Sequence, residues 1–374
     1  MSIYVNQNGD LDQSGHPLVP GVDELTTMVL KAIADETQRA AAAALAKELG
    51  TGANIEAILS KIRLLQNAVG TETVHNLNAA GYQSLGQTIC TQIGKIVDAR
   101  LPPQRNAYNE LIAWISGTLR SHAIEIFTTN YDLLFEEAFE KVRAPYFDGF
   151  TGGRAPFFDP VSVAGDDLPS RWSRLWKLHG SLGWSLESGM IVRGRGATAT
   201  ELIYPDHLKY DLTQKQPYTA LFERLKNFLL TPDTLLMTIG FSFRDAHVAA
   251  VLDEALAMNA NAAVFAFQYG LLEQEKSSCE MAFDRPNISV YAGDGAVING
   301  IAGEWQPGET PKNWEEIRKS FWGTEPGETK PEFLLGDFVM FARFCSLAQA
   351  SELQEVEQPP GTNLSSAPTN NAEQ

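Results

Sequence analysis

AIEIFTTNYD, residues 123–132, joins a short apolar segment to a run of hydroxyl, amide and carboxylate side chains. Branched and aromatic residues fill its first six positions and favour a β-strand, because such side chains pack well on a pleated surface. Apolar residues at helical spacing follow directly, at Leu134, Phe135, Ala138, Phe139 and Val142. The region therefore predicts a strand, a polar turn and an amphipathic helix, in that order.

The same order recurs towards the C-terminus. Four further apolar runs have the length of a strand, at residues 174–178, 234–239, 262–267 and 288–291. Amphipathic helices are predicted between them, over 218–229 and 246–258. Short apolar strands that alternate with helices are typical of a parallel sheet covered on both faces. The expected fold class is therefore α/β, with a Rossmann-like parallel sheet.

The segments around this core are expected to be helical or irregular. Residues 24–122 are rich in helix formers, which predicts a helical lobe inserted into the α/β domain. Residues 184–211 are expected to form an inserted hairpin and loop, and residues 302–330 an irregular connection. A helix is predicted over 333–347, and a disordered tail from Ser351 onward, because no basic residue occurs there and polar residues dominate.

Length and composition bound the class of protein. The 374 residues suffice for about two domains, and we expect a domain over 1–300, an appendage over 301–350 and a tail over 351–374. Hydrophobic residues make up 44% and charged residues 20%, as in ordinary globular proteins. The 29 Lys and Arg against 46 Asp and Glu give a net charge of −17, which disfavours direct binding to nucleic acid or to anionic membranes.

Targeting signals and cysteines exclude further classes. The first 15 residues have neither the basic start nor the apolar run of a secretory signal, and no apolar run reaches the length of a membrane span. A cytoplasmic protein is therefore expected. The 3 cysteines lie far apart, which excludes a four-cysteine zinc site and disfavours a disulfide framework. No metal is expected.

Polar clusters follow three of the predicted strands: TTNYD at 128–132, KLHGS at 177–181 and IGFSFRD at 239–245. The carboxyl ends of parallel strands meet at one sheet edge, and open α/β sheets bind their ligands there. Each cluster also has a structural interpretation, because Asn and Asp cap helices and Gly and Ser make turns. The three clusters together indicate a ligand site.

In order and spacing the clusters resemble the sirtuin superfamily, in which TxN-x-D, HG and G-x-S segments converge on NAD. The form found here is especially similar to the NAD-cleaving sirtuin-like proteins of prokaryotic anti-phage systems, over about residues 120–300. The resemblance implies catalytic roles for Asn130, His179 and Asp132. It implies NAD contacts at Thr129, Gly180, Ser181, Gly240 and Ser242.

The resemblance also reaches the N-terminus. Sirtuins have a strand there, then a Gly-Ala-Gly-x-Ser loop for the diphosphate that closes in Gly-Ile-Pro. Ile3-Tyr4-Val5 could be that strand, and Gly15-His16-Pro17 matches the close. This alignment implies NAD contacts at Gly9, Gly15 and Pro17, although Asp10 would place unfavourable charge beside a phosphate. The alternative is that residues 1–14 are a frayed leader.

One later loop resembles the sirtuin segment that contacts adenine. Asp294 lies between two glycines after the strand predicted over 288–291. The resemblance implies a further NAD contact at Asp294. A plain turn accounts for the same residues.

The expected activity is hydrolysis of NAD to nicotinamide and ADP-ribose. Protein deacylation is disfavoured, because the four-cysteine zinc ribbon of the deacetylases is missing. Asn130 would orient the ribose hydroxyls or the attacking water, and Asp132 the nicotinamide amide. His179 would accept a proton near neutral pH. The alternative, favoured by the altered glycine loop, is a non-catalytic module that binds a nucleotide or acts as a scaffold.

Uncontrolled NAD cleavage would kill the host, so such an enzyme must be gated. The resemblance implies a toxic effector of abortive infection, gated as a homo-oligomer or by a partner such as a HerA-like hexameric ATPase. The helical region 24–122 and the aromatic residues near the C-terminus are candidate assembly surfaces, with ordinary core as the alternative.

Overall fold

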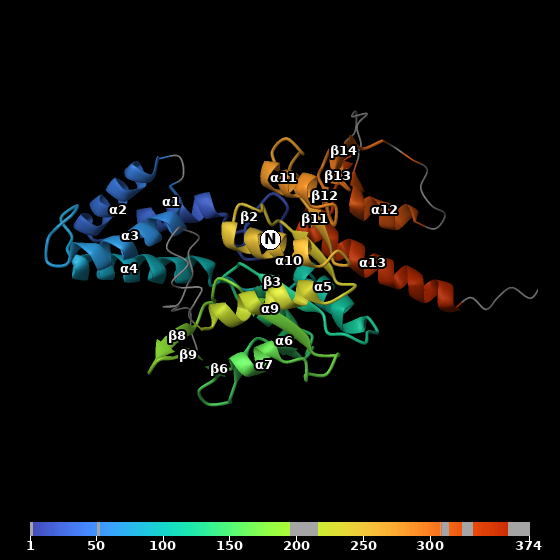
Figure 1. Cartoon of the computed structure of the whole chain (residues 1–374), viewed down its shortest axis with the longest axis horizontal. Coiled ribbons are helices and arrows are strands. Elements are labelled where there is room, and N and C mark those ends of the chain that lie inside the picture. Colours follow the sequence, from blue (N-terminus) through green and yellow to red (C-terminus); the bar gives the residue numbers. More distant parts are fainter. Residues whose placement is uncertain are drawn as a thin grey trace, which may run out of the picture.

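The chain folds into an α/β structure of parallel strands between layers of helices, as predicted, although the strands form two separate sheets (Figure 1). The structure is a computed structural model. It describes residues 3–50, 53–194, 216–306, 308, 314–323 and 332–357. Within helices, only the backbone is described at 315–316 and 350–357.

The first sheet has three parallel strands. Its order is β3 (Glu125–Thr128), β7 (Ser173–Lys177) and β4 (Tyr146–Phe147). β3 and β7 confirm two of the predicted strands, and β4 was not predicted. Every residue of the central strand β7 is buried, whereas three of the four residues of β3 are only half-buried.

The second sheet has three parallel strands and an antiparallel extension. β10 (Leu235–Ile239), β11 (Ala263–Phe267) and β12 (Ile288–Tyr291) are parallel, and they confirm the other three predictions. The extension is antiparallel and consists of β13 (Gly295–Ile298) and β14 (Ile301–Glu304). β10 is at the end of this sheet, and none of its residues is fully buried.

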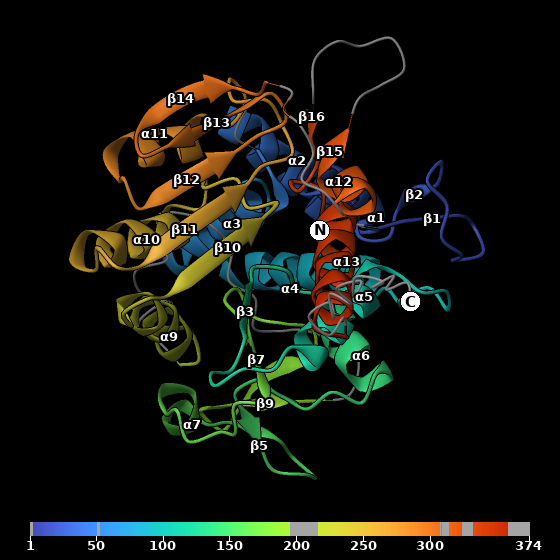
Figure 2. The same cartoon turned by 90° about the vertical axis from the view of Figure 1, so that its right-hand side faces the viewer.

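The same two helix layers cover both sheets (Figure 2). One layer contains α5 (Ala107–Gly117), α6 (Leu134–Lys141) and α13 (Phe338–Glu357). The other contains α7 (Pro160–Ala164), α9 (Tyr218–Leu230), α10 (Ala246–Met258) and α11 (Lys276–Asp284). Successive strand residues point to opposite faces. Accordingly, Leu175 of β7 and Phe267 of β11 pack on the first layer, and Trp176 and Val264 on the second.

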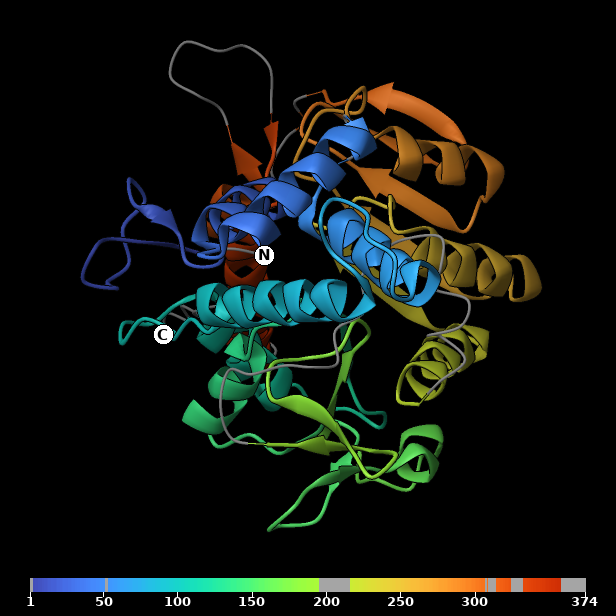
Figure 3. The ribbon, with the colours of Figure 1, turned by 90° about the vertical axis from the view of Figure 1, so that its left-hand side faces the viewer.

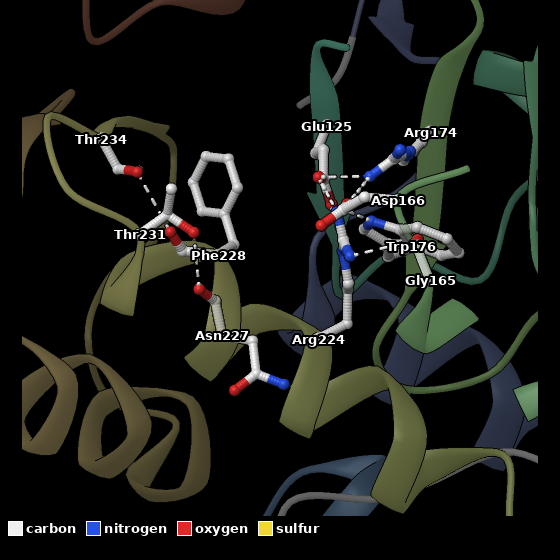
Figure 4. A network of polar contacts seen from close by, with 10 residues as sticks. All are labelled: Glu125, Gly165, Asp166, Arg174, Trp176, Arg224, Asn227, Phe228, Thr231 and Thr234. Atoms are coloured by element: carbon white, nitrogen blue, oxygen red, sulfur yellow. Dashed lines mark hydrogen bonds and ion pairs between the residues drawn. The ribbon is translucent and has the colours of Figure 1, made fainter. Parts of the chain in front are cut away.

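An ion network, buried except for Asp166, joins the amino-terminal half of β3 to its neighbours (Figure 4). Arg174 Nη1 lies 3.1 Å from Glu125 Oε1, and Trp176 Nε1 donates to Glu125 Oε2 at 2.7 Å. Arg224 of α9 donates to both oxygens of Glu125, and Asp166 accepts from both arginines. Because every member of the network has a partner of opposite charge, it fastens β3, β7 and α9 together without an unpaired buried charge.

Four helices form the expected lobe, with a hydrophobic core of their own. They are α1 (Val22–Ala32), α2 (Glu36–Leu49), α3 (Ile55–Val69) and α4 (Ala79–Val97). The last predicted helix of this region, α5, belongs to the sheet layer instead. Tyr131 and Leu182, from the loops after β3 and β7, insert into the core of the lobe. The lobe therefore lies against the carboxyl edge of the first sheet (Figure 3).

Short strands form three small sheets around the core. One consists of β5 (Phe150–Thr151), β6 (Phe157–Phe158), β9 (Met190–Arg193) and β8 (Trp184–Glu187). Two pairs complete the set: β1 (Tyr4–Val5) with β2 (His16–Pro17), and β15 (Trp322–Gly323) with β16 (Glu332–Phe333). The β8–β9 hairpin confirms the start of the insertion predicted over 184–211, and its remainder from 195 lies outside the described residues.

Three expectations need correction. The strand expected at residues 3–5 covers only Tyr4–Val5, and it belongs to a local N-terminal hairpin, where it pairs antiparallel with β2 and where Val5 also bridges Leu11. The connection over 302–330 contains a helix, α12 (Glu315–Phe321). The last helix, α13, begins at Phe338 and continues to Glu357, beyond the residue where the tail was expected to start. Residues 358–374 lie outside the described part of the chain.

Two general features bear on function. Within the described part of the chain, no helix has both the length and the apolar character that a membrane span requires. Nor do the described His, Cys, Asp and Glu residues gather in any group of three suited to a metal ion.

Candidate functional site

The first two polar clusters lie at one edge of the first sheet. Thr128 and Lys177 are the last paired residues of β3 and β7, and Leu178 N donates to Thr128 O at 2.9 Å. Asn130 and His179 each follow this matched pair by two residues. The parallel register therefore places both at the carboxyl end of adjacent strands, as the sequence predicted.

The third cluster meets the second through a buried pair. His179 Nε2 lies 2.8 Å from Asp245 Oδ2, with side chains 5% and 10% exposed. Asp245 also accepts the backbone N–H groups of His247 and Val248 through Oδ1, so it caps α10. Since His179 follows β7 and Asp245 follows β10, the carboxyl ends of both sheets share one edge.

This pair has a defined chemical consequence. The contact has the distance of an ion pair but not the geometry of a hydrogen bond. A carboxylate at such a distance stabilises a positively charged imidazole. The pair therefore places an imidazole beside a carboxylate where the second and third motif loops meet.

Asn130 lies at a cavity between the two sheets, which we call the β3–β10 slot. The slot has a volume of approximately 1430 Å³ and is lined by all residues of β3 and β10, and at its carboxyl end by Thr129, Asn130 and Gly240. The backbone N–H of Asn130 donates to Thr128 Oγ1 at 3.1 Å, which shapes the turn. Gly240 has φ of +65°, a conformation that favours glycine, so the chain can turn sharply where β10 ends.

Several predicted site residues have structural partners. Asp132 is buried, and its Oδ1 accepts Leu134 N at 3.1 Å, which holds the first turn of α6. Ser181 is also buried, and its hydroxyl lies 3.5 Å from Tyr131 O. Gly180 has φ of +89° and is buried in the same turn, whereas Ser242 is exposed. The contact of Asp132 is therefore the helix-capping contact that the structural interpretation of its motif predicted.

The structure does not bring the predicted N-terminal residues to the slot. Gly9 lies in a turn of the hairpin, where its N–H donates to Asn6 O, and Pro17 pairs with Tyr4 in β2. Gly15 lies against Val5, and a Cβ there would come within 2.2 Å of the Val5 carbonyl oxygen. Asp294 lies after β12, and its Oδ1 accepts Leu272 N at 2.9 Å. None of these four lines the slot.

Two contributors escaped the sequence analysis. Asp245 stands directly before the predicted helix 246–258, so its capping position could have been recognised, but its contact with His179 depends on the packing of two sheets. Lys177 is buried at the end of β7, where its ammonium group donates to Asp132 O and lies 3.5 Å from Glu136 Oε1. No spacing rule predicts that such a lysine is buried.

Open parallel sheets covered by helices bind their ligands at the carboxyl edge, and the polar motif loops lie there. Residues 124–291 match the family model of the SIR2-like domain. The match covers somewhat less than half of the chain and includes all three motif loops, and it supports the sirtuin-like superfamily for this part. SIR2-like domains use NAD. No curated protein matches the chain.

Proposed function

We propose that this protein is an NAD glycohydrolase, which cleaves the bond between nicotinamide and ribose. The observation that carries the proposal is the His179–Asp245 pair, which joins the second and third motif loops. The SIR2-like match supports NAD as the substrate, and Asn130 at the mouth of the slot supports a ribose contact.

The reaction needs few groups. The C1′–N bond to nicotinamide breaks, and nicotinamide leaves with the electron pair because its ring nitrogen is cationic in NAD. Water forms the new C1′–O bond, and its proton passes to His179. Asn130 orients the water or the ribose hydroxyls. Polar groups held in place at the carboxyl edge of the sheets stabilise the positive charge that develops on the ribose. The products are nicotinamide, ADP-ribose and a proton.

The direct test is nicotinamide release from NAD by the purified protein. We expect His179→Ala to lower the rate by ~10²- to 10⁴-fold, the usual contribution of a general base. His75→Ala is the matched control, since His75 Nε2 also contacts a carboxylate, Glu48, at 2.9 Å, but in the helical lobe. Full turnover in folded His179→Ala would remove that residue from the mechanism.

Asp245→Asn tests the positioning of the imidazole. Asparagine is an equally good helix cap, so α10 should keep its start while His179 loses its anionic partner. We expect a lower kcat with little change in KM for NAD. A variant as active as the parent would show that Asp245 serves only the helix.

One observation favours a second candidate, a nucleotide-binding module without catalysis. The N-terminal hairpin with Gly9, Gly15 and Pro17 is not at the slot, so it supplies no phosphate contact there. Calorimetric titration with NAD beside the release assay separates the two functions. Binding without nicotinamide release, alone and with candidate partners, would support the module.

The biological role proposed with the hydrolase is that of a toxic effector in anti-phage defence. Such an activity must be held inactive until infection, by self-association or by a HerA-like hexameric ATPase acting in trans. Nicotinamide release measured with and without such an ATPase, at several protein concentrations, tests both forms of gating.

A further inference from the structure

The first two motif loops are joined by backbone hydrogen bonds on either side of the candidate catalytic residues. Where β3 and β7 end, Leu178 N donates to Thr128 O at 2.9 Å. Further along both loops, Leu182 N donates to Tyr131 O at 3.0 Å. The two candidate catalytic side chains, one on each loop, therefore lie between these bonds in the sequence.

Lys177 supplies a further bond between the same loops. Its ammonium group donates to the carbonyl oxygen of Asp132, the last residue of TTNYD. The two bonds described above join backbone groups, so most residue types could make them at those positions. The bond from Lys177 is made by a side chain, so it depends on the identity of this residue.

The ammonium group of Lys177 lies in the interior of the protein. Lys177 is 2% exposed and follows Leu175 by two positions in β7, so both side chains point towards the helix layer that contains α6. There the ammonium group lies 3.5 Å from Oε1 of Glu136, which is in the first turn of α6 and has a side chain only 12% exposed. Burial of a cation is costly unless an anion and hydrogen bonds compensate for it. Glu136 and Asp132 O supply that compensation.

Stability alone does not account for a lysine at this position. Replacing a buried ion pair by apolar side chains of similar volume often leaves stability unchanged or raises it. An apolar residue at position 177 would, however, leave Asp132 O without this donor, and TTNYD would lose its side-chain bond to the end of β7. What the lysine adds is therefore a fixed position for the turn.

We infer that Lys177 is a positioning residue, which fixes the loop that carries Asn130 relative to the loop that carries His179. The inference rests on the proposed NAD hydrolysis, because Lys177 affects the rate only through these two side chains. A displacement of ~1 Å in a catalytic group can lower a rate by ~10²-fold. Loss of the Lys177 bond should therefore slow the reaction more than it weakens the binding of NAD.

The test uses a double variant, because Lys177→Met alone would leave the buried carboxylate of Glu136 without its cation. Lys177→Met/Glu136→Gln removes both charges and keeps the side chains close to their original volumes. Glu136→Gln alone keeps the bond from Lys177 to Asp132 O. The matched control is Lys226→Met/Glu254→Gln, which removes an ion pair of the same residue types, 2.7 Å apart, between α9 and α10.

The first readout is the kinetics of nicotinamide release. We expect Lys177→Met/Glu136→Gln to lower kcat by ~10- to 100-fold and to leave KM for NAD within about threefold of the parent. Glu136→Gln alone and the control pair at Lys226 should both keep kcat within about threefold of the parent. A folded Lys177→Met/Glu136→Gln variant with the kcat of the parent would overturn the inference.

The second readout is amide hydrogen exchange, which needs no catalysis. The N–H of Asn130 donates to Thr128 Oγ1 and that of Leu182 to Tyr131 O. We expect both to exchange at least ~10-fold faster in Lys177→Met/Glu136→Gln than in the parent, while the N–H of Leu178 keeps its rate. Equal acceleration at all three N–H groups would mean a general loss of stability and would contradict a positioning role.

Failure of the proposed function would look different from failure of this inference. If the parent protein releases no nicotinamide, NAD hydrolysis is wrong, whatever the variants do. The exchange measurement then decides the role of Lys177 by itself. Faster exchange confined to Asn130 and Leu182 would still support Lys177 as the residue that holds the two loops together, and unchanged exchange would overturn it.

Discussion

Buried charge lies directly behind the motif loops, in α6 and at the end of β7. Burial raises the pKa of Glu136, and the nearby ammonium group of Lys177 only partly offsets this effect. Lys177 is itself buried and also donates to Asp132 O. Lys177 thus links the TTNYD turn to Glu136. The ionisation of the Glu136 carboxyl group therefore affects the stability of the turn that carries Asn130.

The raised pKa of Glu136 predicts the sign of a pH effect. Between the ordinary pKa of a glutamate and the raised value, the folded state binds more protons than the unfolded state, so stability falls as the pH rises. Glu136→Gln removes this titration. We expect the stability of the parent relative to Glu136→Gln to decrease from about pH 4.5 upward, as measured by urea unfolding at a series of pH values.

Glu137→Gln is the control for this prediction. Glu137 is the next residue of α6, and its carboxylate accepts the N–H of Leu101 at 3.1 Å at a partly exposed position. Glu137→Gln removes a carboxylate from the same turn of α6, so it measures how much of the effect comes from the loss of charge alone. A pH-independent difference for Glu136→Gln would show that its carboxyl group titrates alike in both states.

At the scale of the elements, side-chain caps define where most helices of the N-terminal half begin. Asp35, Asn54, Asn78 and Asn106 each accept the N–H three residues ahead, at the starts of α2, α3, α4 and α5. Three of these helices build the lobe, and α5 forms a wall of the slot. Some of these capping residues are exposed and others are buried, so we expect them to contribute different free energies to stability.

Asn106→Ala and Asp35→Ala form a matched pair of cap deletions. Asp35 is exposed, and losing its cap should cost about 1 kcal/mol. Asn106 is 4% exposed and its amide also donates to Pro102 O and Gln104 O, so its removal loses two further hydrogen bonds at a buried position and should cost about 2 kcal/mol or more. Urea unfolding measures both. Equal losses would mean that water replaces the lost contacts at Asn106.

In the whole molecule, the helical lobe and the α/β core meet at the motif loops. Tyr131 belongs to TTNYD, inserts its ring into the lobe core and donates its hydroxyl to Glu56 Oε1 of α3 at 2.9 Å. Leu182, just beyond KLHGS, packs in the same cluster. The lobe thus contacts residues one position beyond Asn130 and three beyond His179, so a displacement of the lobe would reach the candidate site.

A double-mutant cycle measures this contact. We expect Tyr131→Phe and Glu56→Gln to show a coupling of about 1 kcal/mol in the free energy of unfolding, the usual worth of a hydrogen bond. Tyr82→Phe is the control, because the Tyr82 hydroxyl donates to Val74 O within the lobe. Its effect should add to that of Glu56→Gln within about 0.5 kcal/mol. If the effects of Tyr131→Phe and Glu56→Gln also add, the Tyr131 hydroxyl does not join the helical lobe to the α/β core.

Local patterns predicted the elements well and their assembly only in part. The apolar runs at 234–239, 262–267 and 288–291 became β10, β11 and β12, and the stripe at 246–258 became α10. Element type depends on neighbours in the chain, so the sequence carries it directly. The two-residue strands and the helix inside 302–330 have too few residues to show a period, and they were missed or misassigned.

The candidate site divides in the same way. Residue order by itself determined that Asn130 and His179 follow adjacent parallel strands, because each motif begins where an apolar run ends. Only the tertiary structure decided that Asp245 contacts His179, that Lys177 is buried beneath the turn, and that β3 and β10 face each other across a slot. These features join residues between about 45 and 115 positions apart, and they depend on how whole layers pack, for which no local periodicity exists.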